Sequence, residues 1–206
     1  MRKTLLFIFP LFFLFLAGKK GMAQADPGTY LADIKAELNK KWPGNRTVNL
    51  VFHGHSVPTG YANTPNVHRP QAYPFLILNK LQQHYPYSVV NTITTSIGGE
   101  NSAQGEQRFK KDVLPYKPDV LFIDYALNDR RIGLEKTKQA MEKMIKMALK
   151  KHIKIILVTP SPDLKVDITV PGNILEQYTN QLIALAQQYH IGLANSYAAF
   201  VNLAKS

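Results

Sequence analysis

The stretch Val48-Asn-Leu-Val-Phe-His-Gly-His-Ser-Val-Pro-Thr-Gly60 joins a run of strand-forming residues to a turn that carries a serine. The apolar run 48–52 predicts a buried strand, and Gly54-His-Ser56 predicts a tight turn at its carboxyl end. In an open parallel sheet, the crevice outside the carboxyl ends of the strands is the usual place for a ligand. The stretch therefore predicts an α/β fold with the Ser56 hydroxyl in its functional crevice.

Four further short apolar runs predict buried strands, and amphipathic stretches between the runs predict helices. Together with the first, the predicted strands are 48–52, 89–93, 120–124, 154–159 and 191–194. The predicted helices are 72–84, 104–113, 134–152 and 174–189. Strands that alternate with helices are typical of a parallel sheet with right-handed crossovers. We therefore expect a three-layer α/β/α sandwich with a flavodoxin-like five-stranded parallel sheet.

Residues 1–25 have the features of a secretory signal peptide. A basic start precedes the apolar residues 5–17, and the small residues 23–25 resemble a cleavage site. The apolar stretch has 13 residues, fewer than the roughly 18 that span a bilayer, so no stable membrane span is expected after cleavage. Two lysines at positions 19 and 20 are unusual in a signal peptide and leave a retained anchor as the alternative. The sequence thus predicts a secreted or periplasmic protein with one domain, residues 26–206.

The composition sets limits on partners and on the means of stabilisation. The chain has 206 residues, no cysteine and a formal net charge of +11. Cleavage would lower the charge to +7, because residues 1–25 hold four basic residues and no acidic one. No arginine-rich arm, zinc-ligand spacing or aromatic RNA-binding motif accompanies the charge, so we interpret it as a solvated basic face and expect no nucleic-acid partner. Without disulfides, packing must stabilise the fold.

Polar residues gather in three predicted loops, each at the carboxyl end of one of the first three strands. The loops are Gly54-His-Ser56, Ile97-Gly-Gly-Glu-Asn101 and Ala126-Leu-Asn-Asp129. Acyl transfer needs a hydroxyl nucleophile and preorganised donors for the oxyanion. Ser56 would supply the nucleophile, Gly99 a backbone N–H that no Cβ shields, and Asn128 a side-chain amide. The three loops therefore predict a serine acyl-transfer site.

The order of these loops resembles the SGNH, or GDSL-type, hydrolase superfamily over about residues 46–200. The resemblance implies that Ser56 is the nucleophile, that Gly99 rather than Gly98 is the oxyanion glycine, and that Asn128 is the third-block asparagine. It further implies an exported serine esterase or acetyl hydrolase acting on a small ester substrate, such as an acylated carbohydrate. No nucleotide, phosphate-loop or flavin motif is present, so no cofactor is expected.

Two residues depart from the superfamily pattern near the predicted site. His55 stands where the family usually has aspartate, and Ala126 stands where it has glycine. A histidine can brace the loop by hydrogen bonding, so His55 is expected to support the site, as is Asp129 by turning inward to organise its own loop. Because the side chains of chain neighbours usually diverge, direct proton transfer from Ser56 to His55 is not expected.

The Asp-x-x-His block that supplies the general base in this superfamily has no counterpart in the sequence. After Asp167 the only acidic residue is Glu176, and after His152 the only histidine is His190, at the amino end of the last predicted strand. Three interpretations are therefore open: the sequence is incomplete at its carboxyl end, the enzyme uses an unusual base, or the chain is a non-catalytic relative that binds a ligand in the same pocket. The sequence alone does not identify the general base.

His53 and His55 form a His-x-His pair, which invites a metal-site interpretation. No further ligand spacing is visible, so no metal is expected, and a strand-end histidine bonded to backbone is the simpler interpretation. Glu100 and Asn101 are expected to cap the following helix or to line the cleft. Residues of the long loop after the serine are expected to form one wall of the pocket: Tyr61, Asn63, His68 and Tyr73. Arg130 and Arg131 are interpreted as solvated charges.

Overall fold

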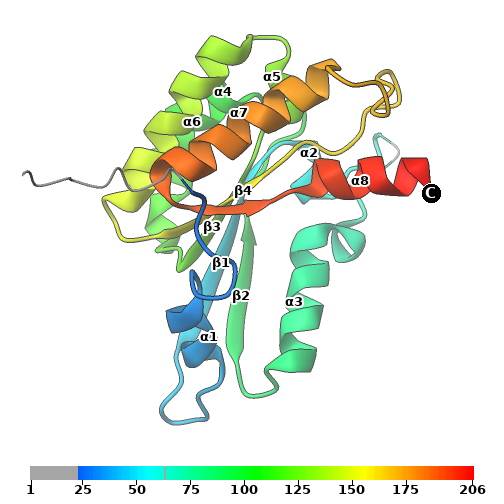
Figure 1. The fold of residues 1–206 in the computed structure, drawn as a ribbon. Helices are drawn as coiled ribbons and strands as arrows, with labels where there is room; N and C mark the ends of the chain where they lie inside the picture. The colour runs from blue at the N-terminus through cyan, green and yellow to red at the C-terminus, as the bar shows by residue number, and fades with distance from the viewer. Residues whose placement is uncertain (1–22, 63) are drawn as a thin grey trace, which may run out of the picture.

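The fold is a parallel five-stranded sheet between two layers of helices, as the sequence predicts (Figure 1). The computed structural model describes residues 23–62 and 64–206, so most of the predicted signal peptide and Asn63 lie outside the described residues. The strands are β1 (Thr47–Gly54), β2 (Val89–Thr94), β3 (Val120–Asp124), β4 (Lys154–Val158) and β5 (Gly192–Ala194). Their order in the sheet is β2-β1-β3-β4-β5, which is the flavodoxin-like order.

Alternation along the strands produces two hydrophobic cores, because successive side chains of a strand point to opposite faces. On one face, Val51 of β1 and Ile123 of β3 belong to the larger core. On the other face, Phe52 and Phe122 stack in a smaller core, with their ring centroids 4.4 Å apart. Both faces of the inner strands are therefore buried, which explains why these strands read as continuous apolar runs.

The helices form the outer layers of the sandwich. The longer helices are α3 (Tyr73–His84), α4 (Ser102–Asp112), α6 (Leu134–Leu149), α7 (Ile174–Tyr189) and α8 (Ser196–Lys205). The short ones are α1 (Ala32–Leu38), α2 (Ser56–Thr59) and α5 (Ala126–Asp129), with 3-10 turns at Arg69–Gln71 and Leu114–Tyr116. Helices α4, α6 and α7 cover the face with the larger core, whereas α1 and α3 pack on the other face, which α8 also borders (Figure 1).

Several boundaries differ from the sequence predictions for local reasons. Helix α4 begins at Ser102, before the predicted start, because Asn101 caps it in a reciprocal pair with Gln104. Helix α6 ends at Leu149, and the chain then turns through His152, which has a left-handed backbone with φ 58°. Within the described parts of the chain, no helix combines the length and apolar character needed to cross a bilayer.

Candidate active site

Ser56 lies where strand β1 gives way to the short helix α2. The strand ends at Gly54, and Ser56 is the first residue of α2, with its side chain half-buried. Gly60 ends the helix with φ 99°, a left-handed conformation that favours glycine, and donates its N–H to the Ser56 carbonyl oxygen at 3.1 Å. This tight turn at the end of α2 holds Ser56 at the carboxyl end of an inner strand.

Hydrogen bonds between backbone and side chains join the three predicted loops to one another. The Ile97 N–H donates to the Gly54 carbonyl oxygen at 3.0 Å, which links the loops after β1 and β2. Asn128 Nδ2 donates to the Glu100 carbonyl oxygen at 3.0 Å and links the loops after β2 and β3. The structure therefore brings together the loops that carry the three predicted site residues.

Of the two adjacent glycines in the second loop, Gly99 is the one with open space around it. Its φ of 77° is left-handed, and a Cβ built on it would meet nothing within 4 Å. A Cβ on Gly98 would instead stand 3.1 Å from the Tyr61 ring. The open surroundings leave room for a substrate atom beside Gly99, whereas Gly98 is packed beneath Tyr61.

Asp129 turns into the protein and organises the loop, as the sequence predicts. It is fully buried, and its Oδ1 accepts the Ser102 N–H at 2.7 Å. The Tyr178 hydroxyl donates to the Asp129 carbonyl oxygen at 3.0 Å, which ties the loop to helix α7. Burial raises the pKa of the Asp129 carboxyl above its usual range, although the hydrogen bonds from Ser102 oppose this shift.

His55 contacts Ser56 directly, so the expectation that their side chains diverge is wrong. His55 Nδ1 lies 3.3 Å from Ser56 Oγ, and the imidazole is fully buried. The side chains converge because the backbone leaves the extended conformation at His55, with φ −103° and ψ −144°, where it begins helix α2. His55 also caps that helix, since Nδ1 accepts the Val57 N–H at 3.4 Å.

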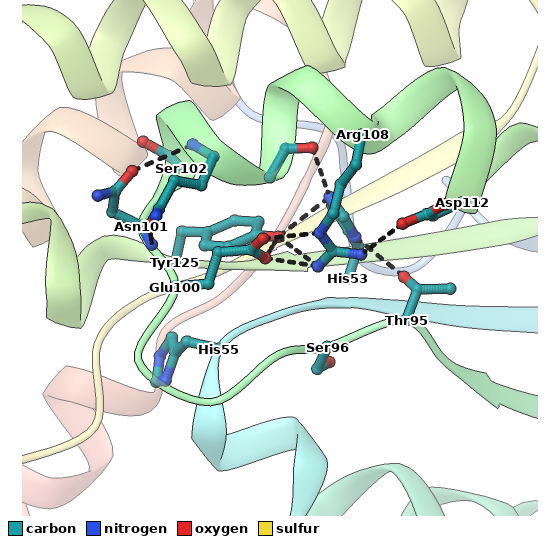
Figure 2. A network of polar contacts seen from close by, with 12 residues as sticks. His53, His55, Thr95, Ser96, Glu100, Asn101, Ser102, Arg108, Asp112 and Tyr125 are labelled. Carbon is teal, nitrogen blue, oxygen red and sulfur yellow. Dashed lines mark hydrogen bonds and ion pairs between the residues drawn. The ribbon is translucent and has the colours of Figure 1, made fainter.

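A buried polar network, which the sequence did not predict, stands behind the second loop (Figure 2). Arg108 of α4 holds the Glu100 carboxylate through two bonds, Nε to Oε1 at 2.7 Å and Nη2 to Oε2 at 2.5 Å. The Tyr125 hydroxyl donates to Glu100 Oε2 at 2.7 Å. Glu100 is therefore buried and anchors the loop. Of the two residues predicted to cap α4, only Asn101 does so. The network fixes the backbone between Gly99 and helix α4.

His53 belongs to the same network and remains neutral. Its Nε2 lies 3.2 Å from the Gly105 carbonyl oxygen, and its Nδ1 lies 2.9 Å from Thr95 Oγ1. Burial, together with the positive charge of Arg108, lowers the pKa of His53 to about 4. The imidazoles of His53 and His55 thus have separate partners. Within residues 23–62 and 64–206, no group of three histidine, cysteine or acidic side chains is placed to hold a metal ion.

Asp124, the last residue of β3, is a further site residue that the sequence analysis did not single out. Its carboxylate is buried, and Oδ1 lies 3.3 Å from His55 Nε2, within ion-pair distance although not aligned as a hydrogen bond. The Tyr73 hydroxyl donates to Asp124 Oδ2 at 3.1 Å. The signal was present in the sequence, because an acidic residue that ends an otherwise apolar strand must face a polar partner.

An apolar cleft opens beside the turn that follows Ser56, between α3, α8 and the carboxyl ends of the strands, although Ser56 itself is not among the residues that line it. Its volume is about 530 Å³, and Asp124 is the single carboxylate among the residues that line it. Val57 and Gly60 of the turn after Ser56 border it. Tyr61, His68 and Tyr73 also line it, so the prediction that the loop after the serine forms one wall is confirmed for these residues.

Arg130 is less solvated than the sequence suggested. Its guanidinium forms an ion pair with Asp163, in the loop that precedes α7, and its Nε donates to the Leu127 carbonyl oxygen at 2.9 Å. Arg131 is exposed, in agreement with its interpretation as a solvated charge. The Arg130 pair ties the third loop to the loop that precedes α7.

The chain is similar to known esterases in sequence pattern and fold. A profile described as "GDSL-like Lipase/Acylhydrolase family" matches residues 52–205. An acetylxylan esterase from Geobacillus stearothermophilus shares 20% identity at a TM-score of 0.67, over 77% of this chain and 80% of that chain. A lipase/acylhydrolase from Enterococcus faecalis shares 22% identity at a TM-score of 0.57, over 75% and 79% of the two chains.

A two-domain esterase active on acetylated mannans is similar over a larger share of this chain. It has 18% identity and a TM-score of 0.66, and the match covers 88% of this chain but 45% of that chain. No curated protein matches the chain significantly in sequence. At these identities, the likeness to the solved structures shows a shared fold.

Proposed function

The chain belongs to the GDSL-like lipase/acylhydrolase family, and from this premise we propose that it is a serine esterase for a small acylated substrate. The observation that carries the proposal is the position of Ser56, at the carboxyl end of an inner strand and one residue before Val57, which lines the apolar cleft. In the proposed reaction, Ser56 Oγ attacks the ester carbonyl carbon, and water then releases the acyl group from the serine.

The donors proposed for the oxyanion come from the two neighbouring loops. No atom stands within 4 Å of the place where a Gly99 Cβ would be, so there is room for a substrate atom beside this residue, and Asn128 Nδ2 uses one of its two hydrogens for the Glu100 carbonyl oxygen. The second hydrogen of Asn128 is thus available for a substrate oxygen. In other enzymes, each such donor contributes roughly 3 kcal/mol to transition-state stabilisation. The Glu100–Arg108 pair supports this role, because it keeps both donors in place before a substrate arrives.

An acetylated carbohydrate is the proposed substrate. Two of the similar structures are named for acetylxylan and acetylated mannans, which are polymers of this class. The cleft beside the turn after Ser56 supports the same assignment, because the aromatic side chains of Tyr61 and Tyr73 offer flat apolar walls to a sugar ring or to an acyl group. We further propose that residues 1–25 direct export, since polymeric carbohydrate is met outside the cell. The intact mass of the secreted protein tests this proposal, with a chain that begins at Asp26 as the expected result.

A second candidate is a ligand-binding protein without catalysis, which would use the same cleft beside the turn after Ser56. If the protein only binds, replacement of the Ser56 hydroxyl should change ligand affinity by less than about tenfold, or 1.4 kcal/mol.

The test is the hydrolysis of p-nitrophenyl acetate and of acetylated xylo-oligosaccharide by the wild type and by Ser56→Ala. The variant should lower kcat/KM by about 1,000-fold or more while the thermal unfolding midpoint is unchanged. Ser88→Ala is the matched control, because Ser88 lies just before β2 at the opposite end of the sheet. Wild-type kcat/KM in Ser56→Ala would exclude Ser56 as the nucleophile. Binding of the oligosaccharide without turnover by the wild type would favour the second candidate.

A further inference from the structure

Four polar side chains form the buried network behind the second loop, and each comes from a different part of the fold (Figure 2). Glu100 belongs to the loop after β2, Arg108 to helix α4 and His53 to β1, and Tyr125 directly follows β3. His53 and Tyr125 are fully buried, and the side chains of Glu100 and Arg108 are 7% and 16% exposed. The network therefore joins the strand ends from which the three site loops leave.

The hydrogen bonds of His53 have one possible direction. Its Nε2 lies 3.2 Å from the Gly105 carbonyl oxygen, which can only accept, so Nε2 carries the proton of the neutral ring. Nδ1 then accepts from Thr95 Oγ1 at 2.9 Å. Nε2 also lies 3.1 Å from the Tyr125 hydroxyl oxygen, which accepts from it. His53 is therefore a donor toward Tyr125 and fixes the orientation of the tyrosine hydroxyl.

The Tyr125 hydroxyl in turn donates to Glu100. It accepts from His53 and, at 3.2 Å, from Arg108 Nη2, so its own hydrogen is directed to Glu100 Oε2 at 2.7 Å. Arg108 holds both carboxylate oxygens of Glu100, with Nε on Oε1 and Nη2 on Oε2. Three donors thus converge on one buried carboxylate, which restricts the Glu100 side chain to one conformation.

Helix α4 contains a glycine that makes room for this arrangement. A Cβ on Gly105 would stand 2.2 Å from the Tyr125 hydroxyl oxygen, so a larger residue does not fit there. A glycine inside a helix costs about 1 kcal/mol relative to alanine. Buried ion pairs often add little net stability, because desolvation of the charges offsets much of their attraction. The network is therefore explained better by the geometry that it fixes than by the stability that it adds.

The backbone of Glu100 connects the network to the proposed oxyanion donors. Its carbonyl oxygen accepts from Asn128 Nδ2 at 3.0 Å, and its N–H donates to the Ile97 carbonyl oxygen at 3.3 Å. Gly99 directly precedes Glu100, so a displacement of Glu100 is transmitted to Gly99 through the planar peptide bond that they share. Both proposed donors are thus attached to the residue whose side chain the network holds.

We propose that Arg108, Tyr125 and His53 are positioning residues for the oxyanion site. They act through the Glu100 carboxylate, because a fixed Glu100 side chain holds the backbone that supports both donors. The proposal deepens the esterase function given above and rests on it. None of the three side chains lines the cleft, so they are assigned no contact with the substrate.

Loss of positioning should affect the transition state more than the ground state. Negative charge develops on the ester oxygen only as the tetrahedral intermediate forms, so misplaced donors should lower kcat and leave KM nearly constant. A displacement of about 1 Å can cost roughly 100-fold in rate. Affinity for a tetrahedral adduct separates this effect from a loss of folded protein, because an affinity does not depend on the fraction of the protein that is active.

The first variant is Tyr125→Phe, which removes one hydroxyl from the network and keeps the ring. Hydrolysis of p-nitrophenyl acetate measures kcat and KM, and calorimetric titration with phenylboronic acid measures affinity for a tetrahedral adduct on Ser56. We expect kcat and this affinity each to fall about 10-fold, with KM within about twofold of the wild type. Tyr87→Phe is the matched control and should behave as the wild type, because Tyr87 precedes β2 at the other end of the sheet and is 53% exposed. Ser56→Ala should bind no boronic acid.

The second variant is Arg108→Lys, which keeps the positive charge but loses the planar group that holds both carboxylate oxygens. We expect kcat and boronic acid affinity each to fall about 100-fold, again with little change in KM. Arg46→Lys is the matched control and should retain both values. Arg46 holds the two carboxylate oxygens of Asp119 at 2.7 and 3.0 Å, at the amino ends of the strands.

A small cation should restore part of the function when the Arg108 side chain is removed. A pocket of about 480 Å³ lies beside Arg108 and gives a guanidinium ion access to Glu100 in Arg108→Ala. Millimolar guanidinium chloride should therefore raise kcat of this variant by about 10-fold or more, whereas sodium chloride at the same concentration should not. Thermal unfolding midpoints recorded under the same conditions show whether the ion acts on the site or on stability.

Unchanged kcat and boronic acid affinity in Tyr125→Phe and Arg108→Lys would overturn the positioning role and leave the esterase function intact. A loss confined to KM, or an equal loss in Arg108→Lys and Arg46→Lys, would overturn it as well. Arg108-dependent binding of boronic acid, in a wild type that hydrolyses no ester, would support the positioning role and contradict the esterase function. A wild type that neither hydrolyses esters nor binds boronic acid would overturn both.

Discussion

Gly54 and Asp124 face each other across strands β1 and β3, so closely that a Cβ on Gly54 would stand 2.3 Å from the Asp124 carbonyl oxygen. Real Cβ atoms do not approach a backbone oxygen this closely, so the glycine is required by the approach of the two strands. The same approach places the His55 N–H on that carbonyl oxygen. The architecture of the sheet and the geometry at Ser56 therefore depend on one residue without a side chain.

Gly54→Ala should separate β1 from β3 at their carboxyl ends. We expect it to lower the free energy of unfolding by about 3 kcal/mol through overpacking, and to lower the proposed esterase activity because the turn that carries Ser56 is displaced. Urea denaturation and kcat/KM check the two effects. Gly44→Ala is the control, since a Cβ there would meet its nearest neighbour, the Lys41 carbonyl oxygen, at 3.5 Å. An unchanged denaturation midpoint in Gly54→Ala would contradict the tight approach.

Glu100→Gln should leave the Arg108 guanidinium without its carboxylate in the buried network. Loss of one partner of a buried ion pair typically costs about 3 kcal/mol or more, so the variant should be destabilised by that amount. The pair of Lys154 and Asp33 supplies the comparison, because the Asp33 side chain is 62% exposed and Asp33→Asn should cost less than about 1 kcal/mol. Denaturant unfolding measures both, and equal effects of the two substitutions would show that the Glu100 pair is not buried in solution.

His53 should make the protein less stable as the solution becomes acidic. The folded protein keeps this imidazole neutral until about pH 4, whereas the unfolded chain protonates it near the usual pKa of 6.5. Between these values the unfolded state binds more protons, so stability falls as the pH falls from 6.5 to 4, by about 3 kcal/mol in all. Above pH 6.5 the residue contributes no pH dependence. The check is the slope of unfolding free energy against pH in the wild type and in His53→Gln, and parallel slopes would refute it.

Leu182→Ala should create a cavity in the larger core. Leu182 is 1% exposed on the apolar face of α7, and truncation of a buried leucine to alanine costs about 2 to 5 kcal/mol. Leu164→Ala is the control, because Leu164 is fully exposed and surface substitutions usually stay within about 0.5 kcal/mol. Guanidinium denaturation midpoints compare the two variants. Coincident midpoints for Leu182→Ala and the wild type would contradict the placement of α7.

The elements that were predictable from the sequence are those whose signal is local. Helix α7 spans residues 174–189 as predicted, because Asn173 caps its start and an apolar stripe follows at helical spacing. Helix α8 was not predicted, although Tyr197, Phe200, Val201 and Ala204 recur at helical spacing. Only Tyr197 among its residues is buried. Helix α1 has seven residues, too few for a periodic pattern to emerge.

The candidate site shows the same division between local and distant information. The positions of Ser56, Gly99 and Asn128 at strand ends follow from the order of strands and loops. The partners of Glu100 could not be predicted, because Arg108 and Tyr125 reach it from two other elements. The contact between His55 and Ser56 depends on the backbone turn at His55, which in turn depends on the register of β1 against β3. Register across a sheet is a tertiary property that no short stretch encodes.

The strand order has a consequence for how the site should fail on heating. Ser56 and His55 follow β1 and Asp124 ends β3, and both strands are flanked on each side by another strand. Amide protons of such inner strands usually exchange with solvent only when the whole domain opens, whereas the ends of a sheet fray at lower cost. The three-residue edge strand β5 can therefore open without disturbing these groups. Heat inactivation should accordingly coincide with global melting, and no partially inactivated, still folded form should accumulate beforehand.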